Sequence, residues 1–153
     1  MNQRLRSVAF VTLSLLVLTT TALLAAAAGG TPYAHLPKAG DAVRFDASAL
    51  KANAAWAYAD QGWLETFLRA SIDAAIAGTG GDDERSPVGR ARQRAVVVDN
   101  GTQGLVGEVQ PFHYRGHDDA EVQVLIKQGP LRNHIYWTTA GELVDGAGRK
   151  YLR

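Results

Sequence analysis

The sequence predicts an α+β protein in which an N-terminal signal or anchor helix, a helical pair and a small antiparallel β-barrel follow one another. Three observations predict this order. Residues 8–28 carry no charge, residues 47–77 place apolar side chains at intervals of three and four, and residues 95–139 contain β-branched runs separated by turn sequences. A chain of 153 residues accommodates one small folded unit and a leader.

Residues 1–28 have the pattern of an export signal. Arg4 and Arg6 come before the uncharged run, and a stretch of alanines ending at Ala28 offers the small residues that signal peptidase accepts. We therefore expect cleavage after Ala28. The uncharged run also reaches the roughly 20 residues that a membrane span needs, so an uncleaved single-pass anchor, with membrane contact through residues 1–28, is the alternative. Both interpretations place the folded part outside the cytoplasm, as a periplasmic or secreted domain.

Composition excludes several classes of function. The chain has no cysteine, which excludes structural disulfides, thiolate zinc sites and cysteine nucleophiles. Sixteen basic residues stand against fifteen acidic ones, and Arg4 and Arg6 belong to the leader, so the remaining chain is almost neutral. No broad positive field is left to attract nucleic acid, and we predict no nucleic-acid partner.

Residues 29–46 and 79–93 are expected to connect the folded parts. The first segment holds prolines and glycines without an apolar period and is predicted as a linker. The second combines glycines, a proline and mixed charges and is predicted as a flexible hinge. The helical pair between them, residues 47–78, is expected to consist of helices at Ser48–Ala59 and Trp63–Ala77.

The predicted helices carry three large aromatic side chains. Trp56, Trp63 and Phe67 lie at positions from which we expect them to fill a core or to dock the helical pair on a neighbour.

The C-terminal part, residues 94–153, is predicted as the barrel. Four runs are rich in β-branched residues: Ala95–Asp99, Leu105–Tyr114, Glu121–Lys127 and His134–Thr139. In the third run, apolar and polar residues alternate with the period of a strand that has one dry face. Short antiparallel strands that close on themselves hide their edges, which favours a small barrel.

In the C-terminal third of the chain, a strand ends in Gly129-Pro130-Leu131, the next strand carries Trp137, and a short helical turn ends at Leu143. These features resemble the last half of a bacterial SH3-like (Src-homology-3-like) domain. Asn133 and Ile135-Tyr136 stand where the family usually has glycines. The resemblance implies an SH3-like barrel and a non-catalytic module of envelope proteins that binds peptide or wall polymer.

Four aromatic residues of the predicted barrel are candidates for a binding edge: Phe112, Tyr114, Tyr136 and Trp137. Aromatic platforms bind extended peptides and sugar rings by stacking and dispersion. In a barrel this small the same rings are also needed to fill the interior, so core packing is the alternative.

One cluster has a spacing found in metal sites: His113, His117, Asp118 and Asp119. It falls at a strand end and a loop, where the side chains share no fixed face, and we predict no metal and no cofactor. The chain contains no GxSxG sequence and no phosphate-binding glycine loop, so we expect no enzyme.

The sequence thus predicts an exported, non-catalytic accessory protein of the cell envelope that contacts an envelope protein or wall polymer. The alternative is a structural subunit of a membrane protein complex, held by an uncleaved N-terminal transmembrane helix.

Overall fold

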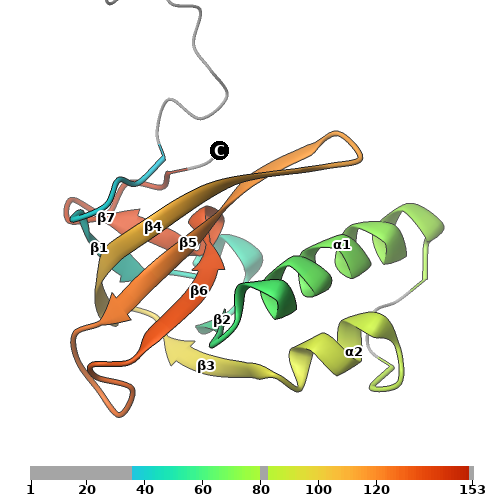
Figure 1. Cartoon of the computed structure of the whole chain (residues 1–153), viewed down its shortest axis with the longest axis horizontal. Helices are drawn as coiled ribbons and strands as arrows, with labels where there is room; N and C mark the ends of the chain where they lie inside the picture. Colours follow the sequence, from blue (N-terminus) through green and yellow to red (C-terminus); the bar gives the residue numbers. More distant parts are fainter. Residues whose placement is uncertain (1–35, 80–82, 152–153) are drawn as a thin grey trace, which may run out of the picture. The chain divides into compact units, whose positions relative to one another are not determined.

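The computed structural model describes residues 36–79 and 83–151, so the predicted signal or anchor lies outside the described residues. Within them the chain forms a seven-stranded antiparallel sheet, and two helices, α1 and α2, run beside each other next to it (Figure 1). The strands are β1 Ala42–Phe45, β2 Ala54–Tyr58, β3 Ala95–Asp99, β4 Gln103–Tyr114, β5 His117–Ile126, β6 Ile135–Thr139 and β7 Leu143–Asp145. The helices are α1 Gln61–Ala77 and α2 Pro87–Arg92, with short 3-10 turns at Ser48–Leu50 (η1) and Ala140–Glu142 (η2).

The sheet has the strand order β3-β2-β6-β5-β4-β1-β7 and curls into a half-barrel. The long strand β4 pairs with β1 at its beginning and with β5 along its length, and its register shifts between Val106 and Val109. Such an irregularity bends a strand and lets it serve two neighbours. The curled antiparallel sheet is consistent with the predicted SH3-like barrel.

The core lies on the inner face of this curl. Val122, Val124 and Ile126 of β5 are completely buried, as the alternation of their strand predicted. Phe45 and Leu143 reach the same core from β1 and the start of β7. Burial of these apolar side chains, which come from strands distant in sequence, stabilises the curled sheet.

Gly104 marks the tightest approach in this core. A Cβ atom at Gly104 would lie 2.2 Å from Cγ1 of Val124 and 3.8 Å from the Phe45 ring. We expect Gly104→Ala to destabilise the fold by about 1–3 kcal/mol, the usual cost of overpacking a well-filled core. Chemical denaturation measures this change.

Gly107, on the same strand, provides the matched control. Its added Cβ would meet mainly the end of the flexible Gln123 side chain. Gly107→Ala should therefore change the free energy of unfolding much less, and equal losses in the two variants would contradict the packing argument.

The first predicted helix, Ser48–Ala59, is wrong, because its second half forms strand β2. All five residues of β2 pair with β3, and Ala55 and Ala57 are fully buried against the sheet. Alanine favours helix locally, but pairing with a strand about forty residues away decides the conformation here. The second predicted helix, Trp63–Ala77, is present as α1, which begins two residues earlier, at Gln61.

The predicted linker and hinge both contain regular structure. Strand β1 lies within residues 29–46, where Arg44 pairs with strands on both sides. Helix α2 lies within residues 79–93, and Ser86 caps it by accepting a hydrogen bond from the Gly89 N–H at 3.0 Å. The sheet therefore includes strands from before residue 94, and the predicted barrel boundary is too late in the chain.

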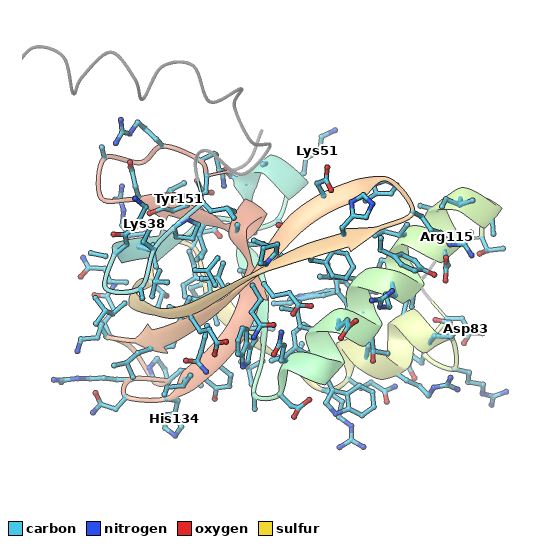
Figure 2. All side chains as sticks on the ribbon, turned by 45° about the horizontal axis from the view of Figure 1, so that its top comes forward. Lys38, Lys51, Asp83, Arg115, His134 and Tyr151 are labelled. Atoms are coloured by element: carbon cyan, nitrogen blue, oxygen red, sulfur yellow. The ribbon has the colours of Figure 1, made fainter. Side chains whose placement is uncertain are left out.

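Helix α1 covers the outer side of strands β2 and β6. Leu64 of α1 is buried with Tyr58 of β2 and Trp137 of β6 in a second apolar cluster. At its far end, α1 meets the tip of the β4–β5 hairpin, where the Arg115 guanidinium lies 2.9 Å from the Asp73 carboxylate (Figure 2). The side chains of β2 thus face two ways, with alanines toward the half-barrel and aromatic rings toward α1.

Candidate functional site

The predicted aromatic edge does not form one surface. Trp137 is 8% exposed and packs beneath α1, whereas Tyr136 is 9% exposed and belongs to the inner core. Phe112 is also buried, and only Tyr114 of the four keeps partial exposure. The Phe112 and Tyr114 rings lie 6.5 Å apart, under the guanidinium of Arg69. The four rings therefore pack in three separate places: beneath α1, in the inner core and under Arg69.

The three residues predicted to dock the helices are divided between two elements. Trp56 belongs to β2, and its ring meets Phe67 of α1 edge-on at 5.4 Å. Trp63 is 37% exposed at the start of α1, with the Arg94 guanidinium 5.3 Å from its ring. Trp56 and Phe67 thus join α1 to the sheet, while Trp63 lies at the rim.

A pocket of about 220 Å³ lies where these aromatic rings meet the end of the sheet. It is lined by two leucines of α1, by Gly141 and by Trp56, Tyr58, Phe67, Asp119, Thr139 and Glu142. We call it the acidic pocket, because its lining has two carboxylates and no Lys or Arg. Its residues come from β2, α1, β5, β6 and η2.

Tyr58 lines the acidic pocket and has a buried hydroxyl. The side chain is 0% exposed, and its hydroxyl has no hydrogen-bond partner. Burial raises the pKa of Tyr58 above its ordinary value, and the nearby charge of Glu142 adds to this, so the phenol stays protonated. A buried polar group without a partner costs about 1–3 kcal/mol, which makes this hydroxyl a candidate for contact with a bound molecule.

Glu142 joins β2 to the rest of the sheet. Strands β2 and β6 share only the pair Tyr58 and Trp137, so the ladder offers little support there. Instead, Glu142 Oε1 accepts the Trp56 N–H at 3.4 Å, and Thr138 Oγ1 lies 2.6 Å from Glu142 Oε2 and 3.3 Å from the Trp56 carbonyl oxygen. Side chains replace the missing backbone hydrogen bonds.

The proton count in this network favours a neutral Glu142. The Thr138 hydroxyl has one proton, so beside a carboxylate it can donate to Glu142 or to the Trp56 carbonyl, and not to both. A protonated Glu142 donates to Thr138 Oγ1, which frees the hydroxyl proton for the carbonyl. Burial likewise raises the pKa of Glu142, and the negative charge of Asp119 adds to the effect.

Two further carboxyls lie close to Glu142. Asp119 accepts the Ala120 N–H at 2.7 Å, and burial raises its pKa despite this hydrogen bond. Glu121 is buried, accepts a hydrogen bond from Gln61 and keeps its second oxygen without a partner. Burial is the main cause of the raised pKa of Glu121, and the charges of Glu65 and Asp119 contribute. The three carboxyls make this end of the sheet acidic.

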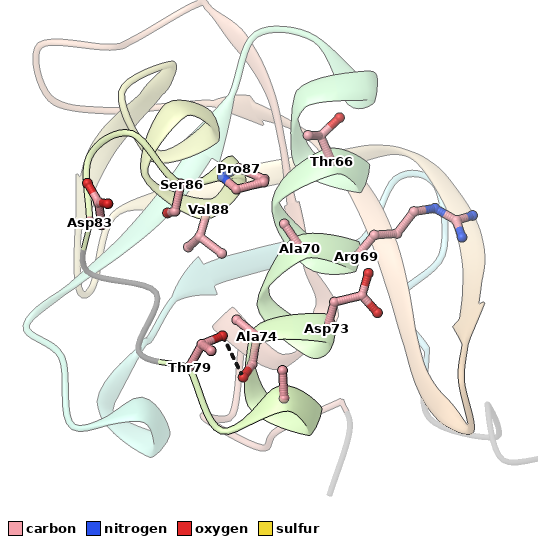
Figure 3. Close-up of a pocket in the computed structure, with 11 residues that line it drawn as sticks. Thr66, Arg69, Ala70, Asp73, Ala74, Thr79, Asp83, Ser86, Pro87 and Val88 are labelled. Atoms are coloured by element: carbon pink, nitrogen blue, oxygen red, sulfur yellow. Dashed lines mark hydrogen bonds between the residues drawn. The ribbon is translucent and has the colours of Figure 1, made fainter.

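A larger pocket, of about 620 Å³, lies between α1 and α2 (Figure 3). Its charged side chains already have partners within the chain, because Arg69 pairs with Glu65 at 2.6 Å and Asp73 with Arg115, and Asp83 accepts the Arg85 N–H at 2.9 Å. Ser86, in the same pocket, caps α2. These polar groups are explained by the fold, whereas the Tyr58 hydroxyl has no partner, which makes the acidic pocket the stronger candidate.

The histidine cluster lies apart from both pockets. His113 pairs with Asp118 near the exposed tip of the β4–β5 hairpin. Among residues 36–79 and 83–151, no group of three His, Cys, Asp or Glu side chains is placed to hold a metal ion. Asp119, which the sequence grouped with these histidines, lines the acidic pocket instead.

Comparison with protein-family models, with curated proteins and with solved structures gave no match to this chain. The functional argument therefore depends on the acidic pocket itself. Its key members, Tyr58, Asp119 and Glu142, come from three distant parts of the sequence, and no motif connects them.

Proposed function

We propose that the chain is an exported, non-catalytic accessory protein of the cell envelope that binds an envelope protein or wall polymer through the acidic pocket. The leader pattern of residues 1–28 supports export. The half-barrel supports an SH3-like module, because the order of elements after β5 matches the resemblance: a turn at Gly129, Trp137 in β6, the turn η2, and Leu143 at the start of β7.

The unpartnered Tyr58 hydroxyl in the acidic pocket carries the binding proposal. Rings and polar groups converge there in a concave space, which is the usual composition of a ligand site. Hydrogen bonds from the chain hold Glu142 and Asp119 in place in the lining, and we assign both to recognition.

Gly141 allows this proposal to be tested without disturbing the fold. A Cβ at Gly141 would meet only Thr139 Oγ1 at 3.8 Å and Asp119 Oδ2 at 4.0 Å, both ordinary contacts. The added Cβ meets no clash, so Gly141→Val narrows the acidic pocket, and circular dichroism verifies that the longer side chain leaves the fold intact; Gly146→Ala, where a Cβ meets nothing within 4 Å, is the control.

The binding experiment uses the mature chain, purified wall polymer and envelope proteins. We expect the wild type and Gly146→Ala to co-sediment with the polymer or to cross-link to one defined envelope protein, and Gly141→Val to lose most of this binding. Binding that is equal in all three folded proteins would overturn the assignment to the acidic pocket, and absence of binding in the wild type would overturn the function.

The alternative, a structural subunit anchored in a membrane complex, is favoured by the length of the uncharged run at residues 8–28. Among the residues that the structure describes, no helix is long and apolar enough to span a bilayer. Mass spectrometry of the protein from its native host distinguishes the two proposals. We expect a mature chain that starts at Gly29, whereas intact residues 1–28 in the membrane fraction would support the anchored subunit.

A further inference from the structure

We propose that the acidic pocket binds a primary ammonium group on a short aliphatic stem, of the kind that ends the side chain of lysine and other diamino acids. This inference rests on the proposed binding function and specifies the ligand. Charge, hydrogen-bond stoichiometry, aromatic surface and size support it independently.

The charge of the lining favours a cation. Asp119 and Glu142 both line the pocket, and no Lys or Arg lines it. The pKa values of both carboxyls are raised by burial, and the charge of Asp119 raises that of Glu142 further. A cation beside Asp119 would compensate its charge and favour release of the proton from Glu142, whereas a neutral sugar or alcohol would leave the Asp119 charge uncompensated.

The hydrogen-bonding groups suit a primary ammonium. Such a group has three N–H donors and no acceptor. Tyr58, whose Oη has no partner within the chain, lines the pocket together with the carboxyl groups of Asp119 and Glu142. A quaternary ammonium has no N–H to donate to these oxygens.

The aromatic rings provide the remaining surface. Trp56 and Phe67 meet edge-on, and the Tyr58 ring lies 5.9 Å from Phe67, so the rings form one wall. Aromatic faces attract cations and pack against aliphatic stems. The Arg92 guanidinium lies 4.3 Å from the Trp56 ring, so Tyr58 and Phe67 remain to contact a bound stem.

The size of the pocket matches the end of a lysine-like side chain. Its volume of about 220 Å³ corresponds to roughly seven water molecules at about 30 Å³ each. A four-carbon stem with its ammonium nitrogen has five non-hydrogen atoms and fits this space.

The test is titration of the mature protein with n-butylammonium, followed by calorimetry or by NMR shifts. We expect weak binding, with a Kd of about a millimole per litre, as is usual for so small a ligand. The neutral isostere n-butanol should bind at least tenfold more weakly. Tyr58→Phe should weaken butylammonium binding about tenfold, because a hydrogen bond to a charged group is lost.

The pH dependence of the titration provides a second readout. Butylammonium keeps its charge below pH 9, as lysine does, so acidification acts on the protein. The titratable groups in the lining are Asp119, Glu142 and Tyr58. Charged groups that act on them from outside the lining are Glu121 on Asp119, Lys150 on Glu142 and Arg92 on Tyr58. As the pocket carboxyls protonate, affinity for butylammonium should fall, while that for butanol should not change.

Two outcomes would overturn this inference: equal affinities for butylammonium and butanol, or butylammonium binding that Gly141→Val leaves unchanged. If wall polymer or an envelope protein binds in a Gly141-dependent manner and butylammonium does not, the ligand class is wrong and the proposed function stands. If the folded wild type binds neither the small cation nor the macromolecules, both proposals are wrong.

Discussion

Replacing Trp137 with Ala should destabilise the folded chain by about 3–5 kcal/mol, the usual cost of deleting a large buried aromatic side chain. Trp137 is 8% exposed and packs with Tyr58 and Leu64, so its removal leaves a cavity under α1. It also lies opposite Tyr58 in the only pair that joins β2 to β6. Most small domains are stable by about 5–15 kcal/mol, so this loss removes a large part of the total.

Thermal and urea denaturation, followed by circular dichroism, measure this effect. Trp63→Ala is the matched control, because it removes the same side chain from a site that is 37% exposed. We expect it to cost far less than Trp137→Ala. A Trp137→Ala protein that keeps wild-type stability and loses partner binding would show that Trp137 is a contact residue, as the sequence allowed, and not a packing residue.

The sequence predicted those elements whose pattern is local. Strand β3 has the predicted bounds, β6 differs by one residue at its start, and α1 follows its apolar period from Gln61 to Ala77. The turn at Asn100-Gly101 and the alternation in β5 can likewise be predicted from a few neighbouring residues. In each case, the side chains that decide the structure are neighbours in the chain.

Strand β2 was missed because a long-range contact decides it. Residues 54–58 are rich in alanine, which favours helix, yet they pair along their whole length with β3. A local signal exists, since Ala55, Trp56, Ala57 and Tyr58 alternate small and aromatic residues with the period of a strand. Strand β1 has a similar alternation, with Val43 and Phe45 buried and Arg44 between them.

The acidic pocket was missed for the same physical reason. Tyr58, Asp119 and Glu142 come together only after β2 joins β6 and α1 closes over them. The sequence grouped Asp119 with two histidines because they are near in the chain, whereas the fold turns Asp119 toward η2. The large aromatic residues were recognised as important, and the structure assigns most of them to packing.

Replacing Glu142 with Gln should preserve the fold and make the free energy of unfolding less dependent on pH. Glu142→Ala should lower the free energy of unfolding by about 2 kcal/mol. The Gln carbonyl accepts the Trp56 N–H, and its amide donates to Thr138 Oγ1, so the network is complete without a titrating group. Alanine leaves the Trp56 N–H without its partner, which costs about 1–3 kcal/mol for a buried donor.

The sign of the pH effect follows from the direction of the shifts. The folded pKa values of Asp119, Glu121 and Glu142 are raised above ordinary values of 3.8, 4.5 and 4.5. Their contribution to stability is therefore full below those values and is lost as the pH rises through the folded pKa values. Asp46 and Asp145 have lowered pKa values, so their contribution is lost only below about pH 4, outside this window.

Urea denaturation between pH 4.5 and 8 tests this argument. The free energy of unfolding of the wild type should fall across this range, and that of Glu142→Gln should fall less, because one of the three raised carboxyls is absent. The two proteins should be most similar at the acidic end, where Glu142 is protonated and resembles Gln in shape and hydrogen bonding. If Glu142→Gln were as unstable as Glu142→Ala at pH 8, the carboxylate itself would support β2, and the neutral network would be wrong.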